Sequence, residues 1–327
     1  MSSLVTTDVA VAVQKLASSH LCAIPTETVY GLAANAQDEV AIQRVFEAKG
    51  RPIDHPLIVH VPDLQTAQLW LAELPKWAIK LGEAFWPGPL TIVGKRTSLA
   101  SDLITAKQDT VAVRIPDHPL VLRLLSQLQH QGINGIVAPS ANRFGHVSPT
   151  TAEHVLDDLG EYLQGHDDTV LDGGASSVGI ESTIVLVTAQ VPIILRPGAI
   201  TPADVERVTG LMPTLNQSLE IKVSGNLSSH YAPKADVKII DPSSFHSFNE
   251  NAGFIALESI GTPTGLTRLA SPVSSQAYAS ELYAALRLGD DLGLTTIYLC
   301  PPPNDGIGTA IQDRIRRAAH NEGGGSA

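Results

Sequence analysis

Residues 21–61 read LCAIPTETVYGLAANAQDEVAIQRVFEAKGRPIDHPLIVHV, and this stretch decides the fold class. The apolar run at 21–25 predicts a buried strand that ends at a proline, and the β-branched run at 57–61 predicts a second strand. Between them, Asp38 is a typical helix N-cap, apolar side chains follow at helical spacing, and Gly50 is a typical helix stop. Strand, helix and strand in this order indicate an α/β protein.

The same alternation continues toward the C-terminus. Helical patterns run from about residue 64 to 84 with an interruption at Pro75, and from 118 to 130 with a stop at Gly132. Thr150 and Glu153 are spaced as a capping box for a helix through Leu159, and a helix predicted from Thr201 and Pro202 ends at Gly210. Apolar or β-branched runs predict further strands at 90–94, 110–116, 135–140, 169–174, 182–188 and 192–198.

The composition changes after residue 210, which indicates two domains in this chain of 327 residues. Residues 211–235 have little periodicity and many loop residues, so we expect a linker there. Three strands are predicted beyond it, at 236–241, 252–257 and 295–300, with helices at 276–289 and 307–320. We therefore predict a large twisted mixed-sheet domain with flanking helices over 1–210, the linker over 211–235, a small α/β/α Rossmann-like domain over 236–322 and a disordered tail over 323–327.

Charge and cysteine content exclude some classes of protein. The chain has 22 Lys and Arg against 33 Asp and Glu, a net charge of -11, which disfavours a broad nucleic-acid platform. Cys22 and Cys300 are too few for a disulfide framework, so we expect two buried free thiols. The N-terminal stretch has no signal-peptide pattern, and no apolar run approaches the roughly 20 residues that span a bilayer. These features predict a soluble cytoplasmic protein.

The familiar catalytic motifs do not occur. Neither of the two common glycine-rich nucleotide loops is present, nor are a serine-nucleophile elbow or zinc-ligand spacings. Hydroxyl, amide and cationic side chains occur instead around the predicted strand ends, namely Thr26, Thr28, Tyr30, Lys49, Arg51, Arg114, Ser140, Asn142, Ser148, Ser182, Thr183 and Arg196. Ligands of open α/β sheets bind beyond strand ends, so these positions predict a pocket for an anion.

Each of these residues also has a simpler interpretation. Lys49 and Arg51 are equally suited to complement the dipole at a helix C-terminus. Arg114 is compatible with an edge-strand side chain that reaches solvent, and the serines and threonines are common turn residues. The residues alone therefore lead to an enzyme-like α/β protein with a candidate anion pocket.

Seven stretches in order resemble the YrdC-like L-threonylcarbamoyladenylate synthases, in the long form that carries an extra C-terminal domain. They are PTETVYGLAANA, KGRPIDHPLIVH, FWPGPLTIV, VAVRIPDHP, VAPSANRFGHVSPTTAEHV, GIESTIV and ILRPGAIT. SSHYAPKADV resembles the family's linker, and PPPNDGIGTAIQDRIRRAAH resembles the end of its C-terminal domain. One departure is Asn226, where the family more usually has a glycine.

The resemblance implies a reaction and a YrdC-like fold for the large domain. L-threonine, bicarbonate and ATP, with Mg²⁺ as the ATP-borne cofactor, would give threonylcarbamoyl-AMP, pyrophosphate and water. The product would pass to the tRNA threonylcarbamoyl-transfer machinery, which modifies adenosine 37. A nucleotidyl transfer of this kind depends on positioning and charge neutralisation, so no protein nucleophile is needed.

The resemblance also implies site residues. The L-threonine site would comprise Thr28, His60, Arg114, Ala138 and Ser182, with Arg114 pairing the carboxylate. The ATP site would comprise Lys49, Arg51, His55, Thr110, Ser140, Asn142, Ser148, Arg196, and the lid residues His230 and Tyr231. Lys49 and Arg51 would grip the phosphates and are the predicted catalytic pair; no protein-held metal is expected.

Two other functions stay open at this stage. One is an RNA-binding or regulatory YrdC-like protein, which the acidic composition disfavours, and direct binding of tRNA is undecided. The other is a carbamoyl-transfer relative of the hydrogenase maturation proteins, which the lack of zinc-finger cysteines disfavours.

Overall fold

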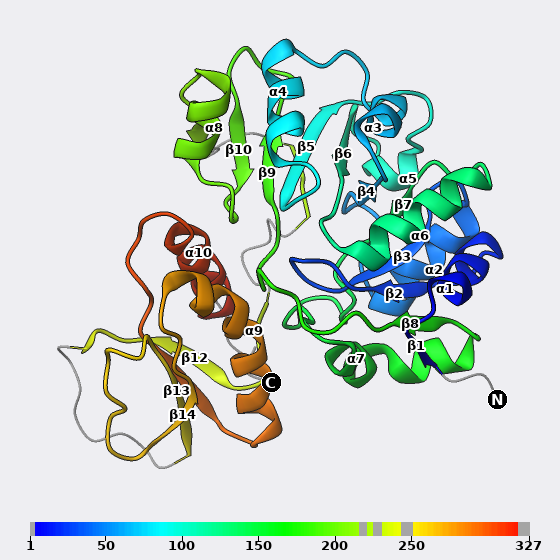
Figure 1. Cartoon of the computed structure of the whole chain (residues 1–327). Coiled ribbons are helices and arrows are strands. Elements are labelled where there is room, and N and C mark those ends of the chain that lie inside the picture. Colours follow the sequence, from blue (N-terminus) through cyan, green and yellow to red (C-terminus); the bar gives the residue numbers. More distant parts are fainter. Residues whose placement is uncertain (1–3, 216–220, 225–230, 243–250, 320–327) are drawn as a thin grey trace. The chain divides into compact units, whose positions relative to one another are not determined.

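The chain folds into two compact units in a computed structural model that describes residues 4–215, 221–224, 231–242 and 251–319 (Figure 1). The first unit comprises Met1–Phe144, Pro149–Ser176 and Glu181–Asn226, and the second comprises Gly145–Ser148, Ser177–Ile180 and Leu227–Ala327. Two short segments thus belong to the second unit although they lie, in sequence, within the first, and all residues from Leu227 onward belong to the second unit. The predicted domain boundaries at 210 and 235 stay a prediction.

The described part of the first unit is built on an eleven-stranded mixed sheet, in the order β1-β8-β2-β3-β7-β4-β6-β5-β9-β10-β11. The strands are β1 Val5–Thr6, β2 Cys22–Ile24, β3 Gly31–Asn35, β4 Ile58–His60, β5 Leu90–Lys95, β6 Thr110–Arg114, β7 Ile136–Val137, β8 Thr169–Leu171, β9 Thr183–Leu186, β10 Ile193–Arg196 and β11 Thr214–Leu215. β4 and β6 run parallel, while β5 pairs antiparallel with β6. This confirms the predicted large mixed sheet.

Helices flank this sheet, as expected. They are α1 Val9–Ala17, α2 Glu39–Lys49, α3 Leu64–Trp70, α4 Lys76–Phe85, α5 Asp102–Thr105, α6 Pro119–His130, α7 Ala152–Gly165 and α8 Pro202–Thr209. The predicted ends of α2 are confirmed, because the Asp38 carboxylate accepts from the backbone N–H groups of residues 40 and 41, and Gly50 is left-handed with φ 62°.

Apolar side chains cover both faces of the sheet because strand residues alternate in direction. In β2, Cys22 and Ile24 belong to a core cluster with α1 and α6, whereas Ala23 belongs to the larger cluster that includes α2 and α7. Both faces of the central strands are thus buried, and ligand-binding groups are left to the strand ends and loops.

The second unit has a four-stranded parallel sheet in the order β12-β15-β13-β14, with α9 Ser275–Asp291 and α10 Gly308–Ala319 packed on it (Figure 1). Its strands are β12 Asp236–Ile239, β13 Ala252–Ile255, β14 Leu266–Ala270 and β15 Thr296–Leu299. The parallel α/β arrangement confirms the predicted Rossmann-like class.

Some predicted elements were wrong or missing. The helix N-cap is Thr151 rather than Thr150, its hydroxyl accepts from His154 N, and α7 continues past Leu159 to Gly165. A glycine at position 160 costs a helix only about 1 kcal/mol relative to alanine, so burial of the apolar face carries α7 through it. The strands β1, β3, β11 and β14 and the helix α5 were not predicted. β3 and β14 lack the β-branched content that marks a strand, and β1, β11 and α5 are only two to four residues long.

Two further expectations concern the whole chain. Cys22 and Cys300 are buried free thiols, as predicted, and burial raises the pKa of Cys22 to about 12. Within the described ranges, no helix combines the length and the apolar character needed to cross a bilayer.

Candidate active site at the strand ends of the first unit

Arg114 ends strand β6 and is only 4% exposed. Its Nη1 donates to Thr28 Oγ1 at 2.9 Å, its Nη2 donates to Glu27 Oε1 at 2.6 Å, and its Nε donates to Gly88 O at 3.3 Å. An arginine has five N–H donors, so two of them, one on each Nη, remain beyond these three contacts within the described structure. A pair of N–H groups on the two terminal nitrogens is the arrangement that takes a carboxylate end-on.

The loop after β2 holds Thr28 at this point. Thr26 Oγ1 donates to Val29 O at 2.6 Å and accepts from the backbone N–H groups of residues 28 and 29, so the loop closes as a tight hydroxyl-capped turn. The two threonine hydroxyls lie 2.8 Å apart. Thr26 is therefore a structural residue of the turn, and Thr28 faces Arg114.

His60 ends β4 and lies beside Arg114 in the parallel register of β4 and β6. It is buried, and desolvation, followed by the charge of Arg114, lowers its pKa to about 3. A neutral ring at physiological pH has one donor and one acceptor nitrogen. Its Nδ1 lies 3.3 Å from Ile58 O, so we infer that Nδ1 carries the proton and Nε2 is the acceptor.

Ala138 follows β7, on the strand that pairs with β4. Its backbone N–H donates to Ile58 O at 3.2 Å. A Cβ added at Gly31 would lie 3.0 Å from the Ala138 Cβ, which is tighter than nearly all real contacts. The glycine at position 31, the first residue of β3, therefore lets the backbone at the start of this strand approach Ala138 closely.

Ser182, just before β9, connects to a second arginine. Arg196 Nη2 donates to Ser182 Oγ at 3.0 Å, and Arg196 Nε donates to Ser182 O at 3.0 Å. On its other side, Ser182 Oγ lies 2.7 Å from the hydroxyl of Thr91 on β5. All three side chains are at most 3% exposed.

Lys49 is the last residue of α2 and is 2% exposed. Its ammonium group donates to the carbonyl oxygens of Ser140 and Asn142, at 2.5 and 2.6 Å. Burial lowers its pKa well below the usual value, and the neighbouring charge of Arg51 lowers it further. Lys49 therefore holds the loop after β7 against α2 and, with Arg51, forms a cationic pair at the helix end.

Arg51 and Arg196 meet on one residue of the segment 221–224, which we call the strap. Arg51 Nη2 donates to the Ser224 hydroxyl at 3.0 Å, and Arg196 Nη1 donates to the Ser224 carbonyl at 2.9 Å. Arg51 Nη2 also donates to Pro56 O at 2.9 Å. The guanidinium groups of two predicted ATP-site residues thus converge on neutral oxygens of the strap.

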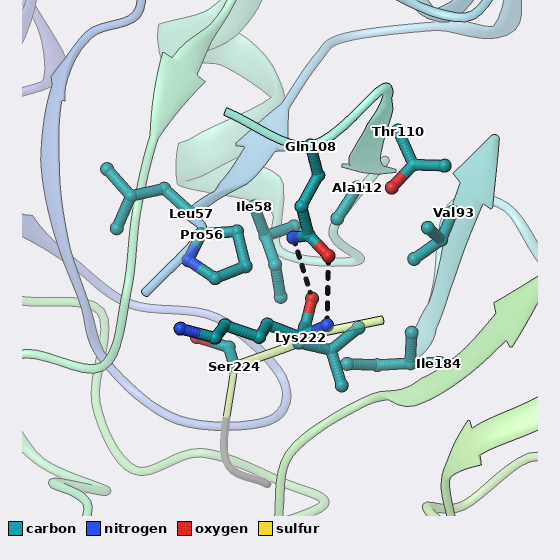
Figure 2. Close-up of a pocket in the computed structure, with 11 residues that line it drawn as sticks. Pro56, Leu57, Ile58, Val93, Gln108, Thr110, Ala112, Ile184, Lys222 and Ser224 are labelled. Carbon is teal, nitrogen blue, oxygen red and sulfur yellow. Dashed lines mark hydrogen bonds between the residues drawn. The ribbon is translucent and has the colours of Figure 1, made fainter. Parts of the chain in front are cut away.

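The strap covers a small, mostly apolar recess that Thr110, Ala112, Ile184 and other side chains line (Figure 2). Gln108 holds it there with two hydrogen bonds: its Nε2 donates to Lys222 O at 3.0 Å, and its Oε1 accepts from Lys222 N at 2.9 Å (Figure 2). Val223 packs into the apolar cluster of β5, β9 and β10. The predicted ATP residue Thr110 therefore faces the recess beneath the strap.

His55, the next predicted ATP residue, is partly buried and packs edge-on against the Phe144 ring, with 5.4 Å between ring centroids. Burial and the charge of Arg51 lower its pKa. Its Nε2 is 3.7 Å from an Asp54 oxygen, a weak contact for a neutral imidazole.

The remaining predicted residues belong to the second unit or lie outside the described ranges. Ser148 is fully buried in the second unit. Tyr231 is 1% exposed, stacks on Tyr283 with ring centroids 5.6 Å apart, and lies 5.5 Å from the Arg314 guanidinium carbon. His230 and Asn226 fall outside the described residues. The ATP contacts of Ser148, His230 and Tyr231 stay predictions.

The structure adds four residues that sequence patterns did not mark, namely Glu27, Thr91, Gln108 and Ser224. Each touches a predicted site residue or a segment that does, and none has a motif of its own. Within the described residues, no group of three or more His, Cys, Asp or Glu side chains is placed to hold a metal ion.

Comparison with known proteins places this chain in a family. Residues 14–198 match the Sua5/YciO/YrdC family model, described as "Telomere recombination", which gives the class of the first unit. Residues 200–320 match the model described as "Threonylcarbamoyl-AMP synthase, C-terminal domain". The chain belongs to the threonylcarbamoyl-AMP synthase family, as its motifs predict.

Relatives in two organisms match nearly the whole chain. The threonylcarbamoyl-AMP synthase of Pyrococcus abyssi is 36% identical over 314 residues, which are 91% of this chain and 90% of the relative. That of Bacillus subtilis is 35% identical over 328 residues, 95% of this chain and 92% of the relative. The crystal structure of P. abyssi Sua5 complexed with L-threonine has a TM-score of 0.84 at 34% identity, and the match covers 95% of this chain and 94% of that one.

Proposed function

We propose that this chain condenses L-threonine, bicarbonate and ATP into threonylcarbamoyl-AMP, with release of pyrophosphate and water. The observation that carries the proposal is the buried Arg114–Thr28 pair at the end of β6, in a chain that matches threonylcarbamoyl-AMP synthases over more than nine tenths of its length. The L-threonine complex of P. abyssi Sua5 supports an amino acid as one substrate.

The site residues fall into two groups, one for the threonine carboxylate and one for the triphosphate of ATP. Arg114 offers two N–H groups to the threonine carboxylate, and Thr28, His60 and Ser182 surround it with polar groups. Arg51, Lys49 and Arg196 supply positive charge for the triphosphate. Mg²⁺ would arrive with ATP and screen the phosphate charge. The second unit would support the predicted lid.

The chemistry balances without a protein nucleophile. The threonine amine and bicarbonate form a carbamate with loss of water, and a carbamate oxygen then attacks the α-phosphorus of ATP while pyrophosphate leaves. Fixed cations that neutralise the developing charge are the chief contribution a protein makes to such a transfer. The mixed anhydride product is labile in water, so we expect this chain to work in the cytoplasm next to the tRNA threonylcarbamoyl-transfer machinery.

The test is pyrophosphate release from ATP. We expect release only when threonine and bicarbonate are both present; release that continues without threonine would contradict the proposal. Arg114→Ala should mainly raise the KM for threonine, and Lys49→Ala should mainly reduce ATP use. Arg207→Ala is the matched control, because that side chain is 66% exposed and, among the residues that the structure describes, pairs only with Asp204 on the same helix.

A further inference from the structure

Glu27 is a buried carboxylate to which the proposed reaction assigns no task. It lies in the loop after β2 and is 6% exposed. Burial of a carboxylate is costly unless hydrogen bonds and an opposite charge compensate for it. A glutamate kept here is therefore expected to do something that an apolar side chain would not do.

Its two oxygens make two different contacts. Oε1 accepts from Arg114 Nη2 at 2.6 Å, and Oε2 accepts from the backbone N–H of Asp117 at 3.0 Å. Asp117 follows β6 after two residues, so the carboxylate joins the loop after β2 to the end of the strand that carries Arg114. The ion pair itself is tight, with side-chain exposures of 7% and 5% for Glu27 and Arg114.

The contact fixes the direction of the guanidinium plane. A long arginine side chain loses about 2 kcal/mol of rotamer entropy when it is immobilised. Here Gly88 O, Thr28 Oγ1 and Glu27 Oε1 each take one N–H from a different nitrogen, so the plane is held at three points. Of these, the Glu27 contact is the shortest and has an anionic acceptor, which makes it the strongest of the three.

We infer that Glu27 is a positioning residue, which holds Arg114 so that its two remaining N–H groups face the carboxylate of the amino-acid substrate. The inference rests on the proposed function, because it assumes that Arg114 binds the threonine carboxylate. It extends that function by assigning affinity for the amino acid to a residue that does not itself touch the substrate.

A second role for the same carboxylate would have the opposite effect on binding. If Glu27 served only to compensate the Arg114 charge, its removal would leave a buried cation, and the substrate carboxylate would bind it more tightly. If Glu27 positions Arg114, its removal lets the guanidinium group turn, and threonine binds less tightly. The direction of the change in threonine affinity therefore distinguishes the two roles.

The experiment compares Glu27→Ala and Glu27→Gln with the wild-type chain. Threonine KM and ATP KM are measured by pyrophosphate release, and threonine binding is measured separately by calorimetry. For Glu27→Ala we expect the threonine KM to rise about tenfold or more, with the ATP KM changed by less than about twofold. Glu27→Gln keeps one oxygen for Arg114 but presents an N–H₂ group toward Asp117 N, so its threonine KM should be intermediate.

Asp168→Asn is the matched control for loss of a buried carboxylate. Asp168 is 4% exposed, accepts from Arg44 Nη2 at 2.7 Å and from Leu21 N at 2.7 Å, and so makes the same two kinds of contact. Arg44 also donates to Ser19 O at 3.1 Å, and His20 Nδ1 lies 3.7 Å from Asp168 Oδ1. Within the described residues, Asp168 has no hydrogen bond or ion pair with Arg114. We expect this variant to lose stability and to keep its threonine KM.

Three outcomes would overturn the inference. They are tighter threonine binding in either Glu27 variant, a threonine KM within about twofold of wild type in a folded Glu27→Ala protein, or equal rises in the threonine and ATP KM values. Failure of the proposed function is distinguishable, because a wild-type chain that binds threonine without releasing pyrophosphate still allows the calorimetric comparison. A wild-type chain that does not bind threonine would overturn both.

Discussion

Arg196 Nη2 donates a hydrogen bond to the hydroxyl of Ser182 at 3.0 Å, so a predicted ATP-binding residue directly contacts a predicted threonine-binding residue. The second contact, from Arg196 Nε to the Ser182 carbonyl, fixes the guanidinium against the start of β9. Two substrates that must react with each other would in this way share one hydrogen-bonded pair. The pair provides a physical route for coupling between the two binding sites.

Ser182→Ala should therefore weaken the binding of both threonine and ATP. Loss of the hydroxyl removes one acceptor of the buried Arg196 and one polar group from the threonine site, so we expect the KM of threonine and of ATP to rise by about threefold to tenfold each. Steady-state pyrophosphate release measures both. Ser101→Ala is a suitable control, because the Ser101 hydroxyl has no hydrogen bond within the described residues. A rise in only one KM would show that the pair does not couple the sites.

Thr91→Val should have a smaller effect of the same kind. The hydroxyls of Thr91 and Ser182 are 2.7 Å apart and both residues are buried, whereas valine has nearly the same shape without the hydroxyl. Since Ser182 keeps its contact with Arg196, we expect a loss of about 1 kcal/mol in the free energy of unfolding and a modest rise in threonine KM. Urea unfolding and the kinetic assay give both values. Thr91→Ser keeps the hydroxyl and should retain the wild-type threonine KM; equal behaviour of the two variants would contradict the explanation.

The sequence predicts the positions of most strand ends but not which side chains contact one another there. Thr28 and Arg114 were each predicted from their place after or at the end of a strand, and the structure brings them to 2.9 Å. Glu27 has no pattern of its own, because a glutamate in a polar loop is usually exposed, and its partner Arg114 lies 87 residues away. A charge pair of this sequence separation follows from the tertiary fold alone.

The contacts of the strap also could not be predicted from sequence patterns. Residues 211–235 lack periodicity and predict only a linker, yet Gln108, Arg51 and Arg196 bind its residues 222 and 224. β3, with the sequence GLAAN, is similar: alanine and glycine disfavour a strand, but pairing with β2 and β7 in a buried sheet overrides that preference. Tertiary contacts decide both elements.

Gln108→Leu should loosen the strap. The Gln108 amide makes both hydrogen bonds to the Lys222 backbone, so its loss exposes the Lys222 N–H to exchange. Since a hydrogen bond of this kind contributes about 1 kcal/mol, we expect deuterium uptake in a peptide that covers the strap to become about fivefold faster.

Asp54→Asn is the control for this change. It removes the ion pair between Asp54 and Lys222, whose side chains are 61% and 57% exposed. Exposed ion pairs contribute little, so strap exchange should stay near the wild-type rate. If the strap exchanged faster than wild type in Asp54→Asn but at the wild-type rate in Gln108→Leu, the ion pair rather than the amide would hold the strap.

His60 should make the stability of the first unit depend on pH. Its folded pKa is lowered to about 3 by burial and by Arg114, while an unfolded histidine titrates near pH 6.5. Below pH 6.5 the unfolded chain therefore binds a proton that the folded chain does not. The stabilisation is complete above about pH 6.5 and is lost as the pH falls toward 3, by at most about 1.4 kcal/mol per pH unit for one proton.

The measurement is urea unfolding of the wild-type chain and of His60→Gln between about pH 7.5 and about pH 5, a range that spans the pKa of an unfolded histidine. Burial also lowers the pKa of His55 and His118, so the wild-type slope alone does not isolate His60. The difference in slope between the two proteins does, because glutamine does not titrate. We expect the free energy of unfolding to fall less steeply with acidification in His60→Gln, and equal slopes would mean that His60 accepts a proton in the folded chain.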